Sequence, residues 1–363
     1  MKIDDLIQLP KVRDQHIKSI VPLISPNELK RMFPSNQKTD ALVIESREII
    51  KNIITRKDKR LLGIVGPCSI HDKESAIEYA ESLKALAENV KDRIYLVMRV
   101  YFEKPRTTIG WKGLILDPHI DGSYDIASGL SLAREILLKI TDIGVPAASE
   151  MLDPIVPQYI DDLVSWAAIG ARTIESQTHR NLASGLSTPV GFKNGTSGSL
   201  ELAVNAMESA RHPAGFIGID QDGNTSILST TGNKYSHLIL RGGKNGPNYH
   251  DEDVEEAEDL MIQAGLEPSI VVDCSHANSG KKWPRQKRVL DAIIRQCLRG
   301  HESLAGFMVE SHLCPGNQPI PKRIEDLEYG VSITDECAGW QETETMILKA
   351  YEDLAPLCKE EKA

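Results

Sequence analysis

The sequence lacks the features that would point to a membrane protein, a dinucleotide-binding fold or a disulfide-stabilised domain. No apolar run approaches the roughly 20 residues that a helix needs to cross a bilayer, and no Gly-x-Gly-x-x-Gly turn follows the first predicted strand. No signal peptide is evident, and the cysteines do not have the spacing of a disulfide framework. They are Cys68, Cys274, Cys297, Cys314, Cys337 and Cys358. We therefore predict a protein of the reducing cytoplasm that has no membrane partner.

Positive charge is also scarce. The chain has 42 Lys and Arg against 52 Asp and Glu, a formal net charge of −10. A nucleic-acid-binding protein would need a broad basic surface, so we do not expect nucleic acid as a partner. The short basic run 281–288 is interpreted as the solvated start of a helix. Any cationic site in this acidic chain must therefore be local, and a local site in a cleft attracts small anions.

From residue 61 onward, short apolar runs alternate with helical stretches. This alternation is typical of βα units around a parallel sheet. The runs that we expect to form strands are eight in number: 61–66, 94–100, 145–149, 167–171, 189–192, 237–240, 269–273 and 304–309. Eight such units favour a closed (β/α)8 TIM barrel of the α/β class over an open sheet. We predict one catalytic barrel over residues 61–363.

Two segments lie outside this repeating pattern. Residues 1–60 contain several prolines and end in an amphipathic stretch around 39–55, which predicts an N-terminal extension with one helix. The role expected for this extension, in an interface or in regulation, comes from the resemblance described below. Residues 216–220 and 225–230 flank an Asp-Gly pair, a strong signal for a β-hairpin, here over about 216–231. The hairpin is either decoration or a regulatory or interface element.

Residues that can do chemistry follow every predicted strand. They are Cys68, Arg99, Glu150, Arg172, Lys193, Arg241, His276 and Glu310. A closing helix is predicted over 334–354, with Asp335 near its N-terminus. Because the C-terminal ends of barrel strands meet at one rim, where TIM barrels build their active sites, we expect these side chains to converge there.

The basic members of this group predict an anion-binding site. They include the residues of a stiff loop after the second strand and are Arg99, Lys104, Arg106, Arg172, Lys193 and Arg241. Six like charges at one rim would repel each other unless they held a multiply charged anion, such as two phosphates or a phosphate and a carboxylate. Two alternatives stay open. The loop could be merely solvated, or Lys193 or Lys104 could form a Schiff base, as in barrel aldolases.

A second group mixes soft and hard metal ligands. Its members are Cys68, His276, Glu310 and Asp335. A thiolate, an imidazole and two carboxylates suit one borderline divalent ion such as Mn, Fe, Co or Zn. Cys68 could equally be a small buried apolar residue. His71 and Cys274 are rival ligands, although His71 looks like part of the following helix start.

Four segments, 66–71, 99–108, 189–195 and 240–244, resemble type I 3-deoxy-D-arabino-heptulosonate 7-phosphate (DAHP) synthase. The likeness extends from about Leu61 through the closing helix. It implies a (β/α)8 barrel with an N-terminal extension and an added hairpin, assembled as a homodimer or homotetramer. It also implies the first committed step of aromatic amino-acid synthesis, in which phosphoenolpyruvate, erythrose 4-phosphate and water give DAHP and phosphate.

The resemblance implies roles at matching positions. Cys68, His276, Glu310 and Asp335 look like the family's metal ligands. The residues that match its phosphoenolpyruvate site are Arg99, Lys104, Arg172, Lys193 and Arg241. Arg106 and Thr107 resemble the erythrose 4-phosphate site, Glu150 matches an acidic residue near the reacting carbons, and Lys104 is a candidate proton donor. Octulosonate-phosphate synthase and a catalytically silent, amino-acid-sensing barrel are the alternatives, and the Lys-Pro-Arg-Thr motif and the complete ligand set favour DAHP synthase.

The resemblance further implies feedback control by an aromatic amino acid. The matching residues lie in the extension, in two barrel loops and in the hairpin: Asp14, Ile17, Pro157, Gln158, Leu186, Ser187, Phe216 and Gly218. Phenylalanine-sensitive relatives carry serine at the position of Gly218, and tyrosine-sensitive relatives carry glycine. Glycine leaves room for a phenolic hydroxyl, so we expect tyrosine to be the effector. The alternatives are that Gly218 only relieves strain in a twisted strand, or that the site is vestigial.

Overall fold

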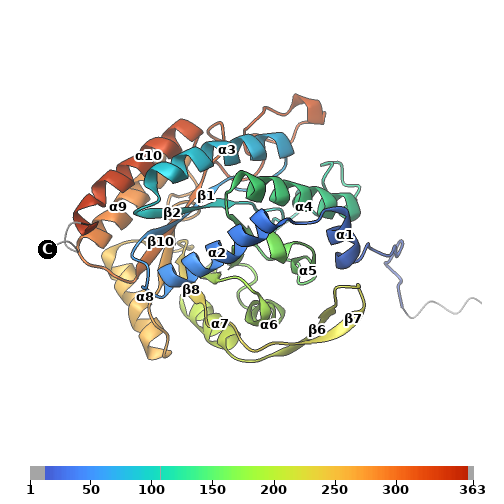
Figure 1. Cartoon of the computed structure of the whole chain (residues 1–363), viewed down its shortest axis with the longest axis horizontal. Coiled ribbons are helices and arrows are strands. Elements are labelled where there is room, and N and C mark those ends of the chain that lie inside the picture. The colour runs from blue at the N-terminus through green and yellow to red at the C-terminus, as the bar shows by residue number, and fades with distance from the viewer. Residues whose placement is uncertain (1–12, 107, 359–363) are drawn as a thin grey trace, which may run out of the picture.

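A closed barrel of eight parallel strands forms the centre of the computed structural model, which describes residues 13–106 and 108–358 (Figure 1). Around the barrel the strand order is β1-β10-β9-β8-β5-β4-β3-β2. The strands are β1 (Leu61–Gly66), β2 (Ile94–Arg99), β3 (Ala147–Glu150), β4 (Trp166–Ile169), β5 (Val190–Lys193), β8 (Ser236–Leu240), β9 (Ile270–Asp273) and β10 (Leu304–Glu310). Each predicted apolar run contributes one strand, so the TIM-barrel prediction is confirmed.

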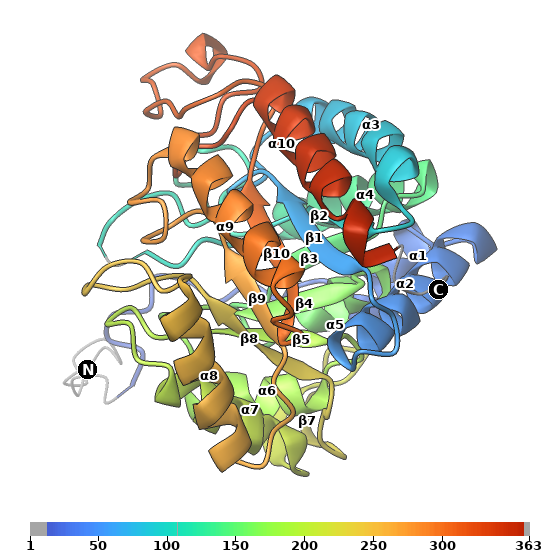
Figure 2. The same cartoon turned by 90° about the vertical axis from the view of Figure 1, so that its left-hand side faces the viewer.

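Helices pack around the outside of this barrel (Figure 2). They are α3 (Lys73–Val90), α4 (Ile126–Ile143), α5 (Pro157–Ile160), α6 (Gln177–Gly185), α7 (Glu201–Arg211), α8 (Asp251–Gln263), α9 (Gln286–Leu298) and α10 (Trp340–Asp353). The basic run 281–288 does lead into α9, through the short 3-10 turn Trp283–Arg285. Within the described ranges, we find no helix that combines the length and the apolar character needed to span a membrane.

The prediction for the closing helix was wrong at its start. Helix α10 begins at Trp340, with Gly339 as its N-cap, so Asp335 lies in the preceding loop. That loop pairs its backbone with the segment after β10, through the bridges Ser311↔Ala338 and Gly316↔Cys337. These non-local hydrogen bonds use backbone groups that a helix would have used internally.

Within residues 13–60, the described part of the N-terminal extension, there are two helices where the sequence predicted one. Helix α2 (Gln37–Ile54) is the predicted one, and α1 (Pro26–Met32) precedes it. The short α1 begins with a capping box, in which Ser25 and Glu28 satisfy each other's backbone N–H groups, and with Pro26 in its first turn. Its seven residues are too few for an apolar period to be visible in the sequence.

Helix α2 covers the N-terminal end of the barrel. Its Ile50, Ile53 and Ile54 belong to the same buried cluster as the inward-facing barrel residues. Near the strand starts, Tyr95 Oη donates to Ser46 Oγ at 2.8 Å. With this end covered, the C-terminal rim is the end of the barrel where loops can build a site.

The predicted hairpin is present. Strands β6 (Gly215–Ile219) and β7 (Thr225–Ser229) pair antiparallel between α7 and β8. The turn residue Gln221 accepts a hydrogen bond from Lys30 Nζ at 2.8 Å and donates one to Gln158 at 2.6 Å. The hairpin therefore links the extension to the barrel loop that contains α5.

Candidate active site

Three of the four predicted metal ligands converge at the C-terminal rim. One ligand atom each of Cys68, Glu310 and Asp335 lies within 4.8 Å of the other two. Cys68 follows β1, Glu310 ends β10, and Asp335 lies in the loop before α10. The end of β1 approaches β2 closely, because a Cβ on Gly66 would lie only 2.9 Å from Arg99 O. Glycine at this position therefore allows the turn that leads to Cys68.

His276, the fourth predicted ligand, lies beside this group. Its Nδ1 is 2.8 Å from Asp273 Oδ2 and 2.8 Å from Ser275 Oγ, while its Nε2 is 3.9 Å from Glu310 Oε1. The backbone φ of His276 is 50°, a left-handed conformation that costs a non-glycine residue about 1–3 kcal/mol. Nδ1 is thus occupied by protein partners, and Nε2 is the atom that remains for a metal.

The rival ligands lie apart from this group. His71 packs the edge of its ring against His312, with centroids 6.1 Å apart, and its buried Nδ1 has no hydrogen-bond partner in the described ranges. Cys274 Sγ lies 3.9 Å from Val272 O, inside the wall of the barrel. Neither belongs to the ligand cluster found among the described residues. The donor set of Cys68, Glu310, Asp335 and His276 Nε2 fits a borderline divalent ion.

Arg99 and Lys104 are in direct contact with the ligand group. Arg99 is fully buried, and its Nη2 donates to Glu310 Oε1 at 3.1 Å. Lys104 Nζ lies 3.0 Å from Cys68 O and 3.2 Å from Cys68 Sγ. Burial works against the charged form of Lys104, but Cys68 and Glu310 outweigh it and raise the pKa of the ammonium group. Lys104 is thus held as a cation next to the ligands.

Tyr101 is a residue that the sequence reasoning missed. The Arg99 guanidinium carbon lies 3.8 Å from the centroid of the buried Tyr101 ring, and Lys104 Nζ and Lys193 Nζ lie 6.0 and 5.9 Å from it. A ring face attracts cations, so the phenol brings three of the predicted cations together. The available signal was that Tyr101 follows Arg99 by two residues, on the same side of an extended chain.

Lys193 ends β5, and Arg241 directly follows β8, the neighbouring strand in the barrel. Lys193 Nζ donates to Asp273 Oδ2 at 3.2 Å, and both side chains are buried. Burial lowers the pKa of the Arg241 guanidinium, and the charge of Arg172 lowers it further. Arg172 is close enough to act on Arg241, although its own side chain is exposed.

The structure describes two of the remaining predicted residues, Arg106 and Glu150. Arg106 is exposed, and its Nε donates to Trp111 O at 2.8 Å, in a loop closed by the bond from Lys104 N–H to Lys112 O. Thr107 lies outside the described residues. Glu150 is buried at the end of β3, and its Oε1 has no hydrogen-bond partner within the described ranges. Buried carboxylate oxygens without a hydrogen-bond partner are rare in proteins. A catalytic role is one explanation for such an atom.

Comparison with known proteins agrees with this geometry. A model of the DAHP synthetase I family matches residues 34–348. This chain belongs to that family. It is 51% identical over 348 residues to the Tyr-sensitive phospho-2-dehydro-3-deoxyheptonate aldolase of Escherichia coli K12, covering 96% of this chain and 98% of that protein. It is 49% identical over 334 residues to the Phe-sensitive enzyme of the same strain, covering 92% and 95%.

A solved member of the DAHP synthetase I family has the same fold. The phospho-2-dehydro-3-deoxyheptonate aldolase of Francisella tularensis SCHU S4 superposes with a TM-score of 0.91 at 45% identity, covering 93% of this chain and 98% of that one. The resemblance seen in the sequence is confirmed. The chain is an enzyme with DAHP synthase activity, which belongs to aromatic amino-acid biosynthesis. The octulosonate-phosphate synthase and silent-barrel alternatives are set aside.

Six of the eight residues predicted to bind an effector come from neighbouring elements of this DAHP synthetase I chain. Pro157 and Gln158 begin α5, Leu186 and Ser187 follow α6, and Phe216 and Gly218 lie in β6, which packs on α6. Gln158 is bonded to the hairpin turn. A Cβ on Gly218 would lie 2.7 Å from Leu228 Cδ1, so a serine here would displace that side chain.

The two effector residues predicted in the extension are exposed and do not come from the elements that carry the other six. Asp14 and Ile17 are joined to each other by the hydrogen bond from Ile17 N–H to Asp14 O, and both residues are exposed. The extension therefore presents them to solvent, and they stay a prediction.

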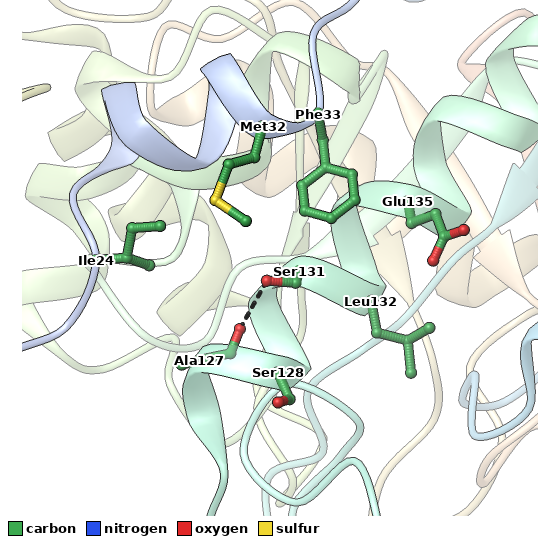
Figure 3. Close-up of a pocket in the computed structure, with 8 residues that line it drawn as sticks. All are labelled: Ile24, Met32, Phe33, Ala127, Ser128, Ser131, Leu132 and Glu135. Carbon is green, nitrogen blue, oxygen red and sulfur yellow. Dashed lines mark hydrogen bonds between the residues drawn. The ribbon is translucent and has the colours of Figure 1, made fainter.

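A hollow of about 420 Å³ lies elsewhere, between α1 and α4 on the outside of the barrel (Figure 3). Ile24, Met32, Phe33 and Leu132 give it an apolar lining. The ionisable residue among its lining side chains, Glu135, is paired with Lys73 at 2.6 Å. This lining offers no free cation for a phosphate, so the rim is the candidate active site.

Proposed function

We propose that the chain condenses phosphoenolpyruvate with erythrose 4-phosphate and water at the C-terminal rim, and that one divalent metal ion held by the ligand group is required. The observation that carries this proposal is the direct contact between the predicted anion-binding cations and the predicted metal ligands. Lys104 Nζ lies 3.2 Å from Cys68 Sγ. The phosphate and carboxylate of phosphoenolpyruvate would satisfy the clustered cations. When bound, the metal supplies a Lewis acid that polarises the aldehyde.

The bonds change as follows. The C2=C3 double bond of phosphoenolpyruvate breaks as C3 bonds to the aldehyde carbon and the oxygen of water bonds to C2. The C2–O bond to phosphate then breaks, the oxygen from water becomes the ketone oxygen, and its second proton leaves with inorganic phosphate. Lys104 donates a proton to the aldehyde oxygen. Glu150 Oε1, which has no hydrogen-bond partner among the described residues, accepts a proton from the water. Arg106 and Thr107 hold the phosphate of the aldehyde substrate. The residues that hold phosphoenolpyruvate are Arg99, Lys104, Arg172, Lys193 and Arg241.

Metal dependence is tested with Cys68→Ala. Because rim residues contribute little to the barrel core, the variant should keep its fold, as measured by circular dichroism, and lose turnover. Cys274→Ala removes the rival buried thiol and should remain active and chelator-sensitive. If Cys68→Ala keeps near-wild-type activity after chelation, the ligand set is wrong.

A Schiff-base reaction is the competing chemistry. A lysine that attacks a carbonyl carbon needs an available Nζ, whereas Lys193 Nζ donates a hydrogen bond to the buried Asp273 Oδ2 at 3.2 Å. Treatment with borohydride in the presence of both substrates should therefore leave the protein mass unchanged. A covalent adduct on Lys193 or Lys104 would favour the aldolase reading.

We also propose that tyrosine inhibits the enzyme by binding beside the hairpin. A relative that is 51% identical is named Tyr-sensitive, and a Cβ on Gly218 would lie 2.7 Å from Leu228 Cδ1, so a serine at this position would reshape the predicted effector site. Activity should fall more steeply with tyrosine than with phenylalanine, and Gly218→Ser should reverse the order. Gly215→Ser is the matched control, because a Cβ on Gly215 meets no atom within 4 Å. Stronger inhibition of the wild type by phenylalanine would contradict the proposal.

Residues 1–60 are proposed to form an interface in a homodimer or homotetramer. The extension exposes Ile17, Ile20 and Val21, and the hairpin exposes Ile217 and Ile227, which pair across β6 and β7. Apolar side chains gathered on extended segments are typical of subunit interfaces. Light scattering at assay concentrations should give a mass of two or four chains, and a monomer would contradict the proposal.

A further inference from the structure

Three asparagines connect the loops that follow β5, β8 and β9, which are neighbours in the barrel (Figure 2). They are Asn194, Asn248 and Asn278. Asn194 and Asn278 are almost fully buried, and Asn248 is half-buried. The reaction steps above do not use any of them. Each is joined to the next by a side-chain hydrogen bond, so together they form one amide network.

Asn194 fixes the backbone that carries Arg241. It directly follows Lys193, and its Oδ1 accepts the backbone N–H of Arg241 at 2.8 Å. Its Nδ2 donates to Gly242 O at 3.0 Å. One side chain of the loop after β5 thus pairs with two backbone groups just after β8, the N–H of Arg241 and the C=O of Gly242. The positions of Lys193 and Arg241, two predicted phosphoenolpyruvate ligands, are coupled through this amide.

Asn248 holds the turn after Arg241 from the other side. Its Oδ1 accepts the backbone N–H of Gly242 at 2.6 Å, and its Nδ2 donates to Asn194 Oδ1 at 3.2 Å. Gly242 has a φ of 71°, and a Cβ there would lie 2.7 Å from Ala277 Cβ. The turn can thus be built only with glycine, which does not by itself prefer one conformation. The two asparagines supply the restraint that Gly242 lacks.

Asn278 connects this turn to the third loop. Its Oδ1 accepts the backbone N–H of Asn248 at 2.8 Å. Its Nδ2 donates to Leu240 O at 3.1 Å and to Asp273 O at 2.9 Å, the carbonyls at the ends of β8 and β9. The network is therefore anchored on the rigid strand ends and extends outward to the loop residues.

The amide group suits this position because it donates and accepts without carrying charge. An aspartate or glutamate would pair with Arg241 and compete with the anionic substrate. Every side-chain amide oxygen and nitrogen in the network has a partner, and a fully satisfied buried network holds one geometry.

We propose that Asn194, Asn248 and Asn278 are positioning residues, which hold Lys193 and Arg241 at the separation that fits phosphoenolpyruvate. This inference rests on the proposed function of the rim. The three asparagines do not contact the substrate in this proposal. Loosening the network should weaken the binding of phosphoenolpyruvate and leave that of erythrose 4-phosphate unchanged.

The test uses Asn248→Ala in the full-length, metal-loaded enzyme, because Asn248 is the half-buried member. A displacement of about 1 Å at a site can reduce rate or binding about 100-fold, so KM for phosphoenolpyruvate should rise about 10- to 100-fold. KM for erythrose 4-phosphate should stay within about twofold, and kcat should fall less than KM rises. Calorimetric titration with phosphoenolpyruvate should show the same loss of affinity.

Two further variants make the result decisive. Asn233→Ala is the matched control, since Asn233 is a buried asparagine that donates to the carbonyls of Leu186 and Thr188, ahead of β5 and β8 and thus at the opposite ends of these strands from the network. It should lower the melting temperature without changing KM for phosphoenolpyruvate. Asn248→Asp keeps an acceptor for Gly242 N–H but loses the donor to Asn194, and it should again raise that KM.

Two outcomes would overturn the inference, and they differ. If wild-type enzyme turns over both substrates while Asn248→Ala and Asn248→Asp leave KM for phosphoenolpyruvate unchanged, the network is merely structural. If the wild type itself fails to convert phosphoenolpyruvate and erythrose 4-phosphate, the proposed function fails first.

Discussion

Asp273 holds two site residues at once, so Asp273→Asn tests how the rim is organised. Its Oδ2 lies 2.8 Å from His276 Nδ1 and 3.2 Å from Lys193 Nζ, and its Oδ1 accepts the Ser275 hydroxyl at 2.7 Å. Burial works against the charged form, yet His276 and Lys193 outweigh it and lower the pKa of this carboxyl well below its usual range. Asparagine keeps the size of the side chain and removes its charge.

The expected loss has two parts. A carboxylate that accepts a hydrogen bond from a ligating histidine fixes the tautomer and the ring, and its loss typically costs 10- to 100-fold in metal affinity, about 1.4–2.8 kcal/mol. The ammonium of Lys193, which is only 4% exposed, also loses its counter-charge. Removing one partner of a buried pair costs about 3–5 kcal/mol. We expect about 3 kcal/mol of lost unfolding free energy, because the asparagine oxygen still accepts one hydrogen bond.

The assay is a metal titration of chelator-stripped enzyme with Mn²⁺ or Co²⁺, followed by competition with a coloured chelator. Asp117→Asn serves as the control, because Asp117 is a buried carboxylate that accepts the N–H of Gly122 at 3.1 Å. It should lower stability and leave the metal Kd unchanged. An unchanged metal Kd in Asp273→Asn would show that His276 is not oriented by this carboxylate, or is not a ligand.

Three further predictions concern other buried groups. Burial raises the pKa of Glu103 from an ordinary 4.5 to about 8, so stability should fall as pH rises through that window, and Glu103→Gln should flatten the melting temperature between pH 5 and 8. Arg134 donates to both oxygens of Asp162 at 2.8 Å and to two backbone carbonyls. Because Arg134→Ala leaves these acceptors without a partner, it should lower the unfolding free energy by about 3 kcal/mol in a denaturant titration. Tyr101→Leu removes a ring shared by three cations and should weaken phosphoenolpyruvate binding by about 1–2 kcal/mol in calorimetry.

Much of the barrel could be predicted because parallel strands that are buried on both faces appear as continuous apolar runs. The hairpin was visible from its Asp-Gly turn for a similarly local reason. The start of α10 was not, because residues 332–338 pair with the segment after β10, and that pairing leaves no periodic signal. Helix α1 was missed because seven residues give less than two full turns of apolar periodicity.

Some residues of the candidate site could likewise be predicted from the sequence, and others could not. Glu310, Lys193 and Arg241 were predictable, since the last residue of a barrel strand, or the next one, points to the rim wherever the helices lie. Tyr101 and Asp273 were not singled out, although both follow or end a strand. Their importance comes from the side chains that contact them. Tyr101 lies near three cations, and Asp273 pairs with a lysine and a histidine.

The sequence by itself determined the order of the strands along the chain, the rim on which the chemistry lies and the residue types that are present there. These depend on local apolar patterns and on the geometry of a parallel barrel, which hold for any such chain. Only the tertiary structure decided which groups pair: that His276 uses Nδ1 within the protein, that Lys104 contacts Cys68, and that three asparagines join neighbouring loops. The contacts of Lys104 and of the asparagines join residues tens of positions apart, and the local pairing of His276 with Asp273 accompanies the left-handed backbone of His276. Apolar periodicity carries no information about either.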